Sequence, residues 1–298
     1  MLPFFSVVIP LYDRADYIIR SIKSVLNQTY SSFELIVVDD ASKDNSVEIV
    51  SGILDPRINL IQLPKNLGNA AARNEGWKAA KGNWIVYLDS DDWFEESFLE
   101  NLEREISNAP EIAFFWSGVR FVNSYNQILK EEIWTPRAEL PSTTFFDELR
   151  IGTNCGVAFQ RDLLKKHNGF DEAFRASVDR EFFLRISQRE KGKSIQKVLV
   201  NCLIGDHKSV RKDYKSQYKA YSKFIALYKD QIQANDSRKK WWYHKMMWLS
   251  LYCKDFDLAK KCLKTLKYPI KSSFIFLIFY ILPNQNAIAM HKKIARNI

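Results

Sequence analysis

Three aspartates within four residues, Asp89, Asp91 and Asp92, are the side chains of this sequence best suited to chemistry. They follow directly on the apolar run 84–88, which is typical of a buried strand, so we expect them at the carboxyl end of that strand. Neighbouring carboxylates repel one another unless solvent or a cation neutralises them, and a hard divalent ion with oxygen ligands does so. The alternative is a solvated turn that begins the next helix, where aspartate is also favoured.

A second acidic pair, Asp39-Asp40, follows a second strand-like run. Apolar runs of strand length alternate with stretches of helical spacing, which predicts a layered α/β fold with a parallel sheet. The predicted strands are 6–9, 33–38, 58–61 and 84–88, and the helices fall near 18–26, 46–50 and 68–80. Since ligands bind at the carboxyl edge of such sheets, we expect the pair to converge with Asp89 and Asp91.

The glycine-rich phosphate loops of nucleotide-binding proteins are missing from the sequence. Neither Gly-x-Gly-x-x-Gly nor Gly-x-x-x-x-Gly-Lys occurs. A phosphate ligand at the acidic edge would therefore need a metal ion and side chains to hold it.

Charge divides the chain of 298 residues into two parts. Residues 1–205 hold 24 Lys+Arg against 29 Asp+Glu, whereas residues 206–298 hold 20 against 6. A basic tail suits nucleic acid, an anionic membrane surface or simple solubility. A nucleic-acid-binding protein would leave the acidic edge unexplained, so we expect no nucleic-acid partner.

Several absences favour a cytoplasmic protein. The N-terminus lacks the basic region of a secretory signal, the four cysteines show no Cys-x-x-Cys spacing, and no apolar run approaches the ~18 residues that span a bilayer. The apolar segment 274–282, flanked by lysines, supports two interpretations: a helix in the headgroup boundary of an anionic membrane, or a buried packing helix. We therefore allow for peripheral attachment to the inner face of the cytoplasmic membrane.

Four segments in order, 7–12 (VVIPLY), 37–42 (VVDDAS), 66–74 (NLGNAAARN) and 88–92 (LDSDD), resemble the family 2 glycosyltransferases. The resemblance covers about residues 4–210. It implies the GT-A fold of nucleotide-diphospho-sugar transferases, with a mostly parallel mixed sheet between helices. Residues 1–110 would bind the nucleotide, 111–210 the acceptor, and 211–298 would form a helical basic extension.

The resemblance also implies roles for individual residues. It places Asp91 as the ligand of Mn²⁺ or Mg²⁺, with His207 close to the metal, and Asp40 as the acceptor for the uracil N3–H. Asp89 would lie near the ribose and Arg73 near the base and diphosphate. The residues implied to bind the nucleotide sugar are Pro10, Tyr12, Arg14, Asp40, Asn66, Arg73, Asp89 and Ser90.

On the acceptor side, the segment 169–185 resembles the family's acidic pair at the start of a helix. Asp179 matches the second acid, the expected general base, and Glu181 and Asp171 are the fallback candidates. The chain departs from the pattern at Val178, where an acid is common. Residues 115–180 should form the acceptor pocket, with these side chains as candidate contacts: Trp116, Arg120, Trp134, Arg137 and Thr153-Asn154-Cys155.

Together these features predict an inverting, metal-dependent transfer of one sugar per encounter, from a UDP-sugar to a glycan or lipid-linked acceptor in cell-surface polysaccharide synthesis. The sequence leaves open the donor sugar, the acceptor and the oligomeric state. A nucleotidyltransferase of the same fold, or a non-catalytic sugar-nucleotide-binding or assembly protein, is the alternative.

Overall fold

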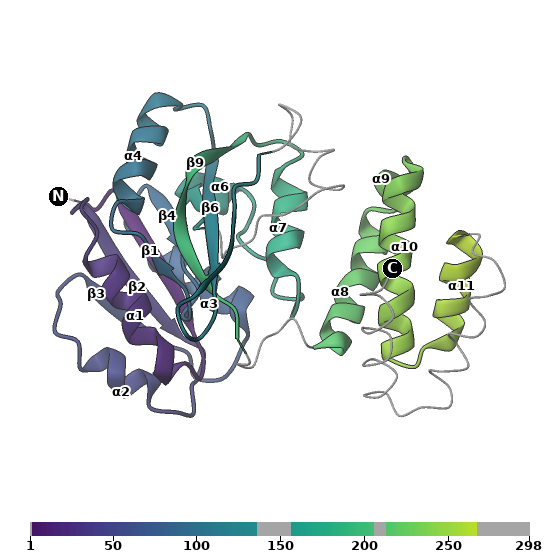
Figure 1. The fold of residues 1–298 in the computed structure, drawn as a ribbon, viewed down its shortest axis with the longest axis horizontal. Coiled ribbons are helices and arrows are strands. Elements are labelled where there is room, and N and C mark those ends of the chain that lie inside the picture. The colour runs from purple at the N-terminus through teal and green to yellow at the C-terminus, as the bar shows by residue number, and fades with distance from the viewer. Residues whose placement is uncertain (1, 136–155, 206–212, 267–298) are drawn as a thin grey trace. The chain divides into compact units, whose positions relative to one another are not determined.

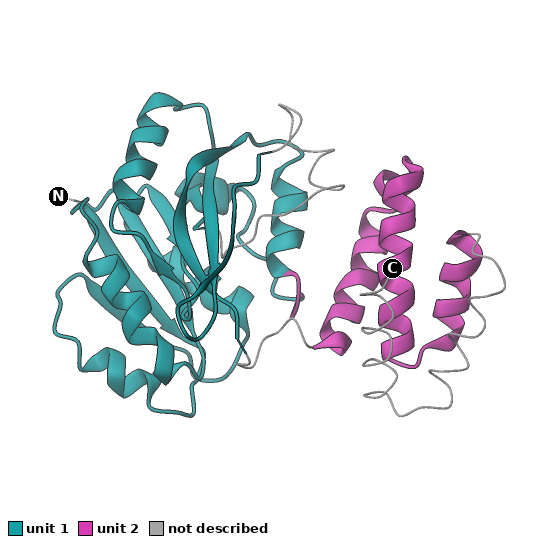
Figure 2. Ribbon diagram, viewed as in Figure 1, with its two compact units in different colours: residues 1–173, 178–207 teal, residues 174–177, 208–298 magenta. Residues whose placement is uncertain are grey.

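The computed structural model describes residues 2–135, 156–205 and 213–266 (Figure 1). Contacts divide the chain into two compact units (Figure 2). Unit 1 comprises residues 1–173 and 178–207, and unit 2 comprises residues 174–177 and 208–298. The predicted site residues in the described ranges all lie in unit 1.

One mixed sheet of nine strands organises unit 1, in the order β3-β2-β1-β4-β8-β6-β9-β5, with β7 paired to β6. The strands are β1 Phe5–Leu11, β2 Phe33–Asp39, β3 Ile58–Gln62, β4 Trp84–Tyr87, β5 Trp93–Phe94, β6 Phe114–Val122, β7 Ile128–Glu132, β8 Ala158–Gln160 and β9 Gly192–Leu203. The first four strands are parallel. Among the others, β6 and β9 are parallel and the remaining pairs are antiparallel. The α/β prediction with a mostly parallel mixed sheet is confirmed.

Six helices of unit 1 connect these strands in the described ranges. They are α1 Ala15–Leu26, α2 Ser46–Ser51, α3 Asn69–Ala79, α4 Phe98–Asn108, α6 Arg161–Lys166 and α7 Val178–Ile186. Apolar residues recur at helical spacing on the inner face of α1, where Ile18, Ile22 and Val25 are buried against the sheet. Because β1 and β4 are buried along their whole length and β2 at every residue but Glu34, their sequences are mostly apolar, and the helices cover them.

Pro10 lies inside β1, although the sequence suggested that it ends the strand. The missing N–H of Pro10 removes no hydrogen bond to β2, because the residue of β1 that bonds to β2 at this point is Leu11, whose carbonyl accepts the backbone N–H of Asp40. On the other side of β1, the Leu88 N–H donates to the Val8 carbonyl. If the parallel pairing of β1 with β4 continued, the next hydrogen bond between these strands would need a backbone N–H at residue 10 as its donor. Proline has none, so β1 and β4 separate there and the chain after Leu88 turns away.

The described residues 213–266 of unit 2 form four helices. These helices are α8 Tyr214–Leu227, α9 Lys229–Gln233, α10 Asp236–Tyr252 and α11 Phe256–Leu266. Side-chain caps begin two of them: Asp213 accepts the Ser216 N–H, and Asn235 accepts the Arg238 N–H. The unit's core contains Phe224, Ile232, Trp242, Met246, Leu249 and Leu251.

Across the described helices of both units, none is long and apolar enough to cross a membrane. The apolar segment 274–282 lies outside the described residues.

Candidate functional site

The acidic turn, residues 88–92, follows the end of β4 and is held from two sides. On the α1 side, the Ser21 hydroxyl donates to the Asp92 carbonyl at 2.6 Å, and Arg20 Nη2 donates to the Asp91 carbonyl at 3.3 Å. On the other side, Asp92 Oδ1 accepts the backbone N–H of Leu203, at the end of β9, at 2.9 Å. The turn is therefore fixed through the backbone carbonyls of Asp91 and Asp92 and through the Asp92 side chain.

Asp92 itself belongs to the core. It is 2% exposed, and its burial, reinforced by the charges of Asp91 and Asp89, raises the pKa of its carboxyl well above the usual range. The expectation that Asp92 starts the next helix is wrong, because β5 follows directly and α4 begins only at Phe98. Its carboxyl group instead connects the acidic turn to the end of β9 through the hydrogen bond from the Leu203 N–H.

Asp89 points toward α3. Its Oδ1 accepts a hydrogen bond from Arg73 Nη2 at 2.8 Å, in an ion pair whose arginine is 3% exposed and whose aspartate is 30% exposed. The arginine fixes one oxygen of the carboxylate, and the aspartate side chain still reaches solvent. The predicted pair of a ribose-side acid and a base-side or diphosphate-side arginine is thus in direct contact.

Asp91 has a second arginine beside it. Arg14 Nε lies 3.5 Å from Asp91 Oδ2, and both side chains are partly exposed. Arg14 follows the end of β1, where its guanidinium also donates to the Asp13 carbonyl at 3.0 Å. Two loops at the same edge of the sheet, one after β1 and one after β4, therefore place a cation and an anion together.

Asp40 is 4% exposed and is engaged by backbone. Its two carboxylate oxygens accept the N–H groups of Leu67 and Gly68, at 2.6 and 2.8 Å, in the loop that opens α3. Asp39, also buried, accepts the N–H of Ser42 instead and closes the turn after β2.

The remaining predicted nucleotide-side residues differ in exposure. Tyr12 is 37% exposed and Asn66 is exposed, whereas Pro10 and Ser90 are buried. Tyr12 and Asn66 therefore offer surface to a ligand through their side chains. Pro10 acts through the strand separation described above.

Asp179 begins α7, where its Oδ1 accepts the N–H of Arg180 at 2.9 Å. It is partly exposed, and it follows Ser177, whose φ of 55° lies in the left-handed region. Of the fallback candidates, Glu181 is 4% exposed and forms a two-bond ion pair with Arg185, at 2.7 and 2.9 Å. That pairing makes Glu181 part of the internal structure of α7. Asp171 caps its own turn by accepting the Ala173 N–H.

Two of the proposed acceptor contacts differ in exposure. Trp116 is 1% exposed, and its indole N–H donates to the Trp134 carbonyl at 2.9 Å, so burial takes its side chain out of reach of an acceptor. Arg120 is hydrogen-bonded to Glu95, Glu131 and Asn201 but is 26% exposed, so its contact with an acceptor stays a prediction. Arg137, residues 153–155 and His207 lie outside the described residues.

Asn74, next to Arg73 on α3, is the residue of this region to which the sequence assigned no role. It is 4% exposed and makes four hydrogen bonds. Three of them go to residues 170 and 172, which are 96 and 98 residues later in the chain. The sequence offered two signals for it: its place beside the arginine and its position as the last residue of the segment 66–74.

The donor set at the acidic turn suits a divalent ion that is shared with a ligand. Within the described ranges, no group of three or more His, Cys, Asp or Glu side chains could hold a metal by itself. Asp91, with Asp89 nearby, offers hard oxygen ligands, and Mg²⁺ is commonly bound through one or two carboxylates plus substrate phosphates. The residues therefore fit an ion that completes its coordination with a diphosphate and water.

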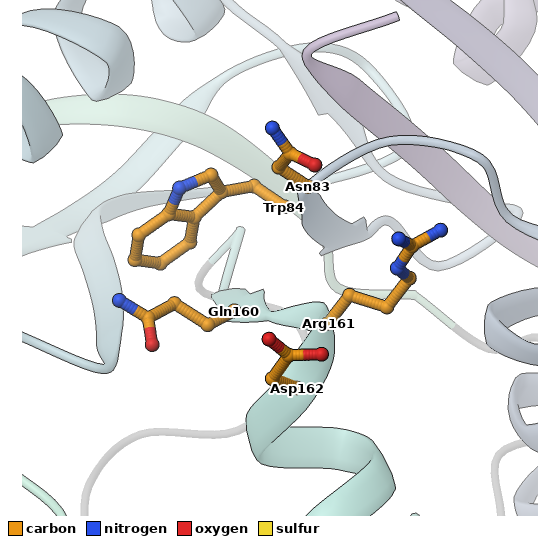
Figure 3. Close-up of a pocket in the computed structure, with 5 residues that line it drawn as sticks. All are labelled: Asn83, Trp84, Gln160, Arg161 and Asp162. Carbon is orange, nitrogen blue, oxygen red and sulfur yellow. The ribbon is translucent and has the colours of Figure 1, made fainter. Parts of the chain in front are cut away.

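A pocket of about 300 Å³ lies elsewhere in unit 1 (Figure 3). Its lining is Asn83, Trp84, Gln160, Arg161 and Asp162. Trp84 begins β4, whereas the acidic turn follows its end, so the pocket belongs to the opposite edge of the sheet. It is no part of the site.

Residues 6–167 match the family model described as Glycosyl transferase family 2. An uncharacterized glycosyltransferase of Haemophilus influenzae is 44% identical over 33% of this chain and 40% of its own length. The hyaluronan synthase of Pasteurella multocida is 30% identical over 70% of this chain and 21% of its own length. For the succinoglycan biosynthesis protein ExoO of Rhizobium meliloti the identity is 34%, over 59% of this chain and 53% of the relative. The alignments thus span about a fifth to about half of these relatives.

Among solved structures, residues 1–349 of Staphylococcus aureus TarS in complex with UDP-GlcNAc share the fold. The TM-score is 0.61 at 18% sequence identity, over 93% of this chain and 79% of that one. The likeness agrees with the mixed sheet described above.

Proposed function

The chain belongs to glycosyl transferase family 2, and from this premise we propose that it transfers a single sugar from a UDP-sugar to a hydroxyl of a glycan or lipid-linked acceptor in cell-surface polysaccharide synthesis. The observation that carries the proposal is the acidic turn after β4. Asp89 and Asp91 reach solvent there, beside Arg73 and Arg14, at the sheet edge where ligands of α/β proteins bind.

The donor and the setting are supported by the relatives. The TarS structure was solved with UDP-GlcNAc, and the named relatives make hyaluronan and act in succinoglycan biosynthesis. A UDP-sugar and a polysaccharide pathway are the assignments consistent with these names. The carboxylate of Asp40, at the end of β2, supplies the acceptor that a uracil N3–H needs.

In the proposed reaction, each residue has a task that follows from its position. Asp91 would hold Mn²⁺ or Mg²⁺, which when bound stabilises the negative charge of the departing diphosphate. Arg73 keeps Asp89 oriented toward the ribose.

On the acceptor side, Asp179 takes the proton of the attacking hydroxyl. The new bond joins the acceptor oxygen to the anomeric carbon as the bond from that carbon to the diphosphate oxygen breaks, and UDP leaves with the bonding electrons. Attack from the face opposite the diphosphate inverts the configuration.

The proposed site of action is the cytoplasmic membrane surface, where lipid-linked acceptors are found. Residues 213–266 carry 12 Lys+Arg against 5 Asp+Glu. On α8, Lys215, Lys219 and Lys223 recur every fourth residue and are exposed, so they form one basic stripe. Such a stripe attracts anionic headgroups.

The enzymatic proposal is tested by incubating the protein with Mn²⁺ and a panel of nucleotide sugars and measuring nucleotide diphosphate release. We expect UDP from one UDP-sugar, loss of release in EDTA and recovery on adding Mn²⁺. Asp91→Asn and Asp179→Asn should each lower transfer by a factor of at least ~100 in folded protein. Undiminished transfer by Asp179→Asn would remove the base assignment, and formation of nucleoside triphosphate from pyrophosphate would indicate a nucleotidyltransferase.

The membrane proposal is tested by flotation with vesicles of phosphatidylglycerol and phosphatidylcholine. The full chain is compared with a chain ending at Lys271 and with the triple variant Lys215→Gln, Lys219→Gln, Lys223→Gln. Loss of flotation on truncation identifies the segment 274–282 as the anchor, and loss in the triple variant identifies the stripe. Flotation unchanged in both would contradict the two anchor assignments, and absence of flotation by the full chain would contradict the membrane proposal.

A further inference from the structure

Asn74 joins the donor side of unit 1 to the turn that precedes the candidate base. Its Nδ2 donates to the Phe170 carbonyl at 2.9 Å and to Glu172 Oε1 at 2.8 Å. Its Oδ1 accepts the Phe170 N–H at 2.9 Å and the Trp77 indole N–H at 3.2 Å. Every hydrogen-bonding direction of this buried amide is therefore used, and residue 170 is held through both of its backbone groups.

The turn is built around this amide. Gly169 has φ of 61°, and a Cβ placed on it would lie 2.4 Å from Asn74 Oδ1 and 2.5 Å from Trp77 Nε1. Only glycine allows the backbone to approach α3 this closely. The contact between α3 and the turn is thus a close one that leaves no room for a shift.

The same turn is tied to α7 from its other side. Arg185 Nη2 donates to the Gly169 carbonyl at 2.8 Å while Arg185 pairs with Glu181. The Phe170 ring packs against Phe182 of α7, with ring centres 4.6 Å apart. Because α7 begins at Val178-Asp179, the position of the candidate base follows the position of this turn.

Phe170 also reaches the donor side. Its ring lies 5.3 Å from that of Tyr87, the last residue of β4, and 5.7 Å from the guanidinium carbon of Arg73. Arg73 in turn holds Asp89. Two consecutive residues of α3 therefore serve the two halves: residue 73 orients the acid on the donor side, and residue 74 orients the turn that leads to Asp179.

We propose that Asn74 is a positioning residue that sets the place of Asp179 relative to the acidic turn, and so couples the acceptor half to the bound donor. The inference rests on the proposed transferase function. It makes a specific demand: without the Asn74 amide, UDP still binds, because Asp40, Arg73 and Asp89 keep their contacts, but the base is misplaced for the attack.

The experiment compares Asn74→Ala, the isosteric Asn74→Asp, and Asn101→Ala as the matched control. Asn101 is a buried asparagine of α4, also 4% exposed, whose bonds go to Ser97, Arg104 and Lys197 and not to the turn. UDP binding with Mn²⁺ is measured by calorimetry, and kcat and donor KM by transfer. We expect both Asn74 variants to bind UDP within twofold of the parent and to lose at least ~30-fold in kcat at unchanged donor KM, while Asn101→Ala keeps its kcat.

A second arm separates positioning from general loss of stability. Asn74→Asp replaces the amide that donates to Glu172 by a carboxylate, so two carboxylates face each other. Adding Glu172→Gln supplies an amide N–H at residue 172, which can donate to the new carboxylate at residue 74. We expect the double variant to recover about tenfold of the lost kcat, which a merely destabilised protein would not do. Parental kcat in folded Asn74→Asp, or UDP binding lost in proportion to kcat, would overturn the inference. Absence of UDP binding and release in the parent protein would instead refute the proposed function itself.

Discussion

The carboxyl group of Asp92 accepts the backbone N–H of Leu203, 111 residues later in the chain, at 2.9 Å. This bond joins the end of β9 to the acidic turn. Its acceptor is 2% exposed and carries a raised pKa, so its side chain serves the structure while its neighbours Asp89 and Asp91 face the ligand side.

The first prediction follows from this bond. Asp92→Ala leaves the Leu203 N–H without an acceptor in a buried place, and should lower the free energy of unfolding by about 1–3 kcal/mol. Asp92→Asn retains the acceptor oxygen without a carboxylate charge, and should be at least as stable as the parent at pH 7. Urea unfolding measures both, and equal destabilisation by the two substitutions would contradict the role of this bond.

Ala41 carries a backbone conformation that suits glycine. Its φ is 60°, and it lies in the turn after β2, directly after Asp40. The left-handed region costs an L-residue about 1–2 kcal/mol, whereas glycine in the unfolded chain costs about 0.4–1 kcal/mol in entropy. Ala41→Gly should therefore raise the free energy of unfolding by about 0.5–1 kcal/mol.

The matched control for that substitution is Ala79→Gly, at the last position of α3. Glycine in a helix costs about 0.5–1 kcal/mol relative to alanine, so this change should act in the opposite direction. Urea unfolding of both variants decides the point, and a loss of stability in both would show that the conformation of residue 41 stores no strain.

Arg14 and a divalent ion would compete for Asp91. Since Arg14 Nε lies 3.5 Å from Asp91 Oδ2 in a partly exposed pair, the arginine stabilises the carboxylate by about 0.2–1 kcal/mol. In the absence of nucleotide, Arg14→Gln should thus bind Mn²⁺ about two- to fivefold more tightly. Electron paramagnetic resonance of unbound Mn²⁺ measures this affinity, and weaker binding by the variant would show that Arg14 favours the ion.

The pair Tyr218 and Asp255 predicts how the stability of unit 2 depends on pH. The Tyr218 hydroxyl donates to Asp255 Oδ2 at 2.6 Å, which lowers the pKa of Asp255 below 3.8 and raises the pKa of Tyr218 to about 12. This hydrogen bond therefore contributes its full stabilisation between pH 3.8 and pH 10, the ordinary pKa values of an aspartate and a tyrosine. The stabilisation is lost as the pH falls below 3.8 through the lowered pKa of Asp255, and as the pH rises toward 12, the raised pKa of Tyr218.

Tyr218→Phe removes this bond. At pH 6 it should lower the free energy of unfolding of unit 2 by about 1 kcal/mol, and the difference from the parent should shrink when the measurement is repeated below pH 3.8. Denaturant unfolding followed by far-UV circular dichroism serves for both conditions. A difference that grows on acidification would contradict the assignment of the hydrogen bond.

The strands and helices of residues 5–87 could be predicted because each depends on local periodicity. Apolar runs bounded by polar turns define β1, β2 and β4, and the spacing of Ile18, Ile22 and Val25 defines α1. The resemblance placed Arg73 near the base and diphosphate and Asp89 near the ribose, and the structure pairs these two side chains. These strands and this helix can be recognised from neighbouring residues alone, without contacts to residues far along the chain.

The errors at Asp92 and Asn74 concern side chains whose surroundings come from far along the sequence. Asp92 is buried because β9 closes over it. Asn74 was missed for the same reason, since its partners are 96 and 98 residues away. Trp116 lies in the core at the end of the apolar run 112–116, a local sign of burial that argued against its use as an acceptor contact.

The separation of β1 and β4 at Pro10 bears on the kinetics of ligand entry. The separation arises from one missing N–H, so it is present before any ligand arrives and persists after the ligand leaves. For the nucleotide proposed to bind at this edge of the sheet, entry at this point breaks no hydrogen bond between β1 and β4. Its association rate should accordingly depend on charge and diffusion, and respond to salt more than to denaturant.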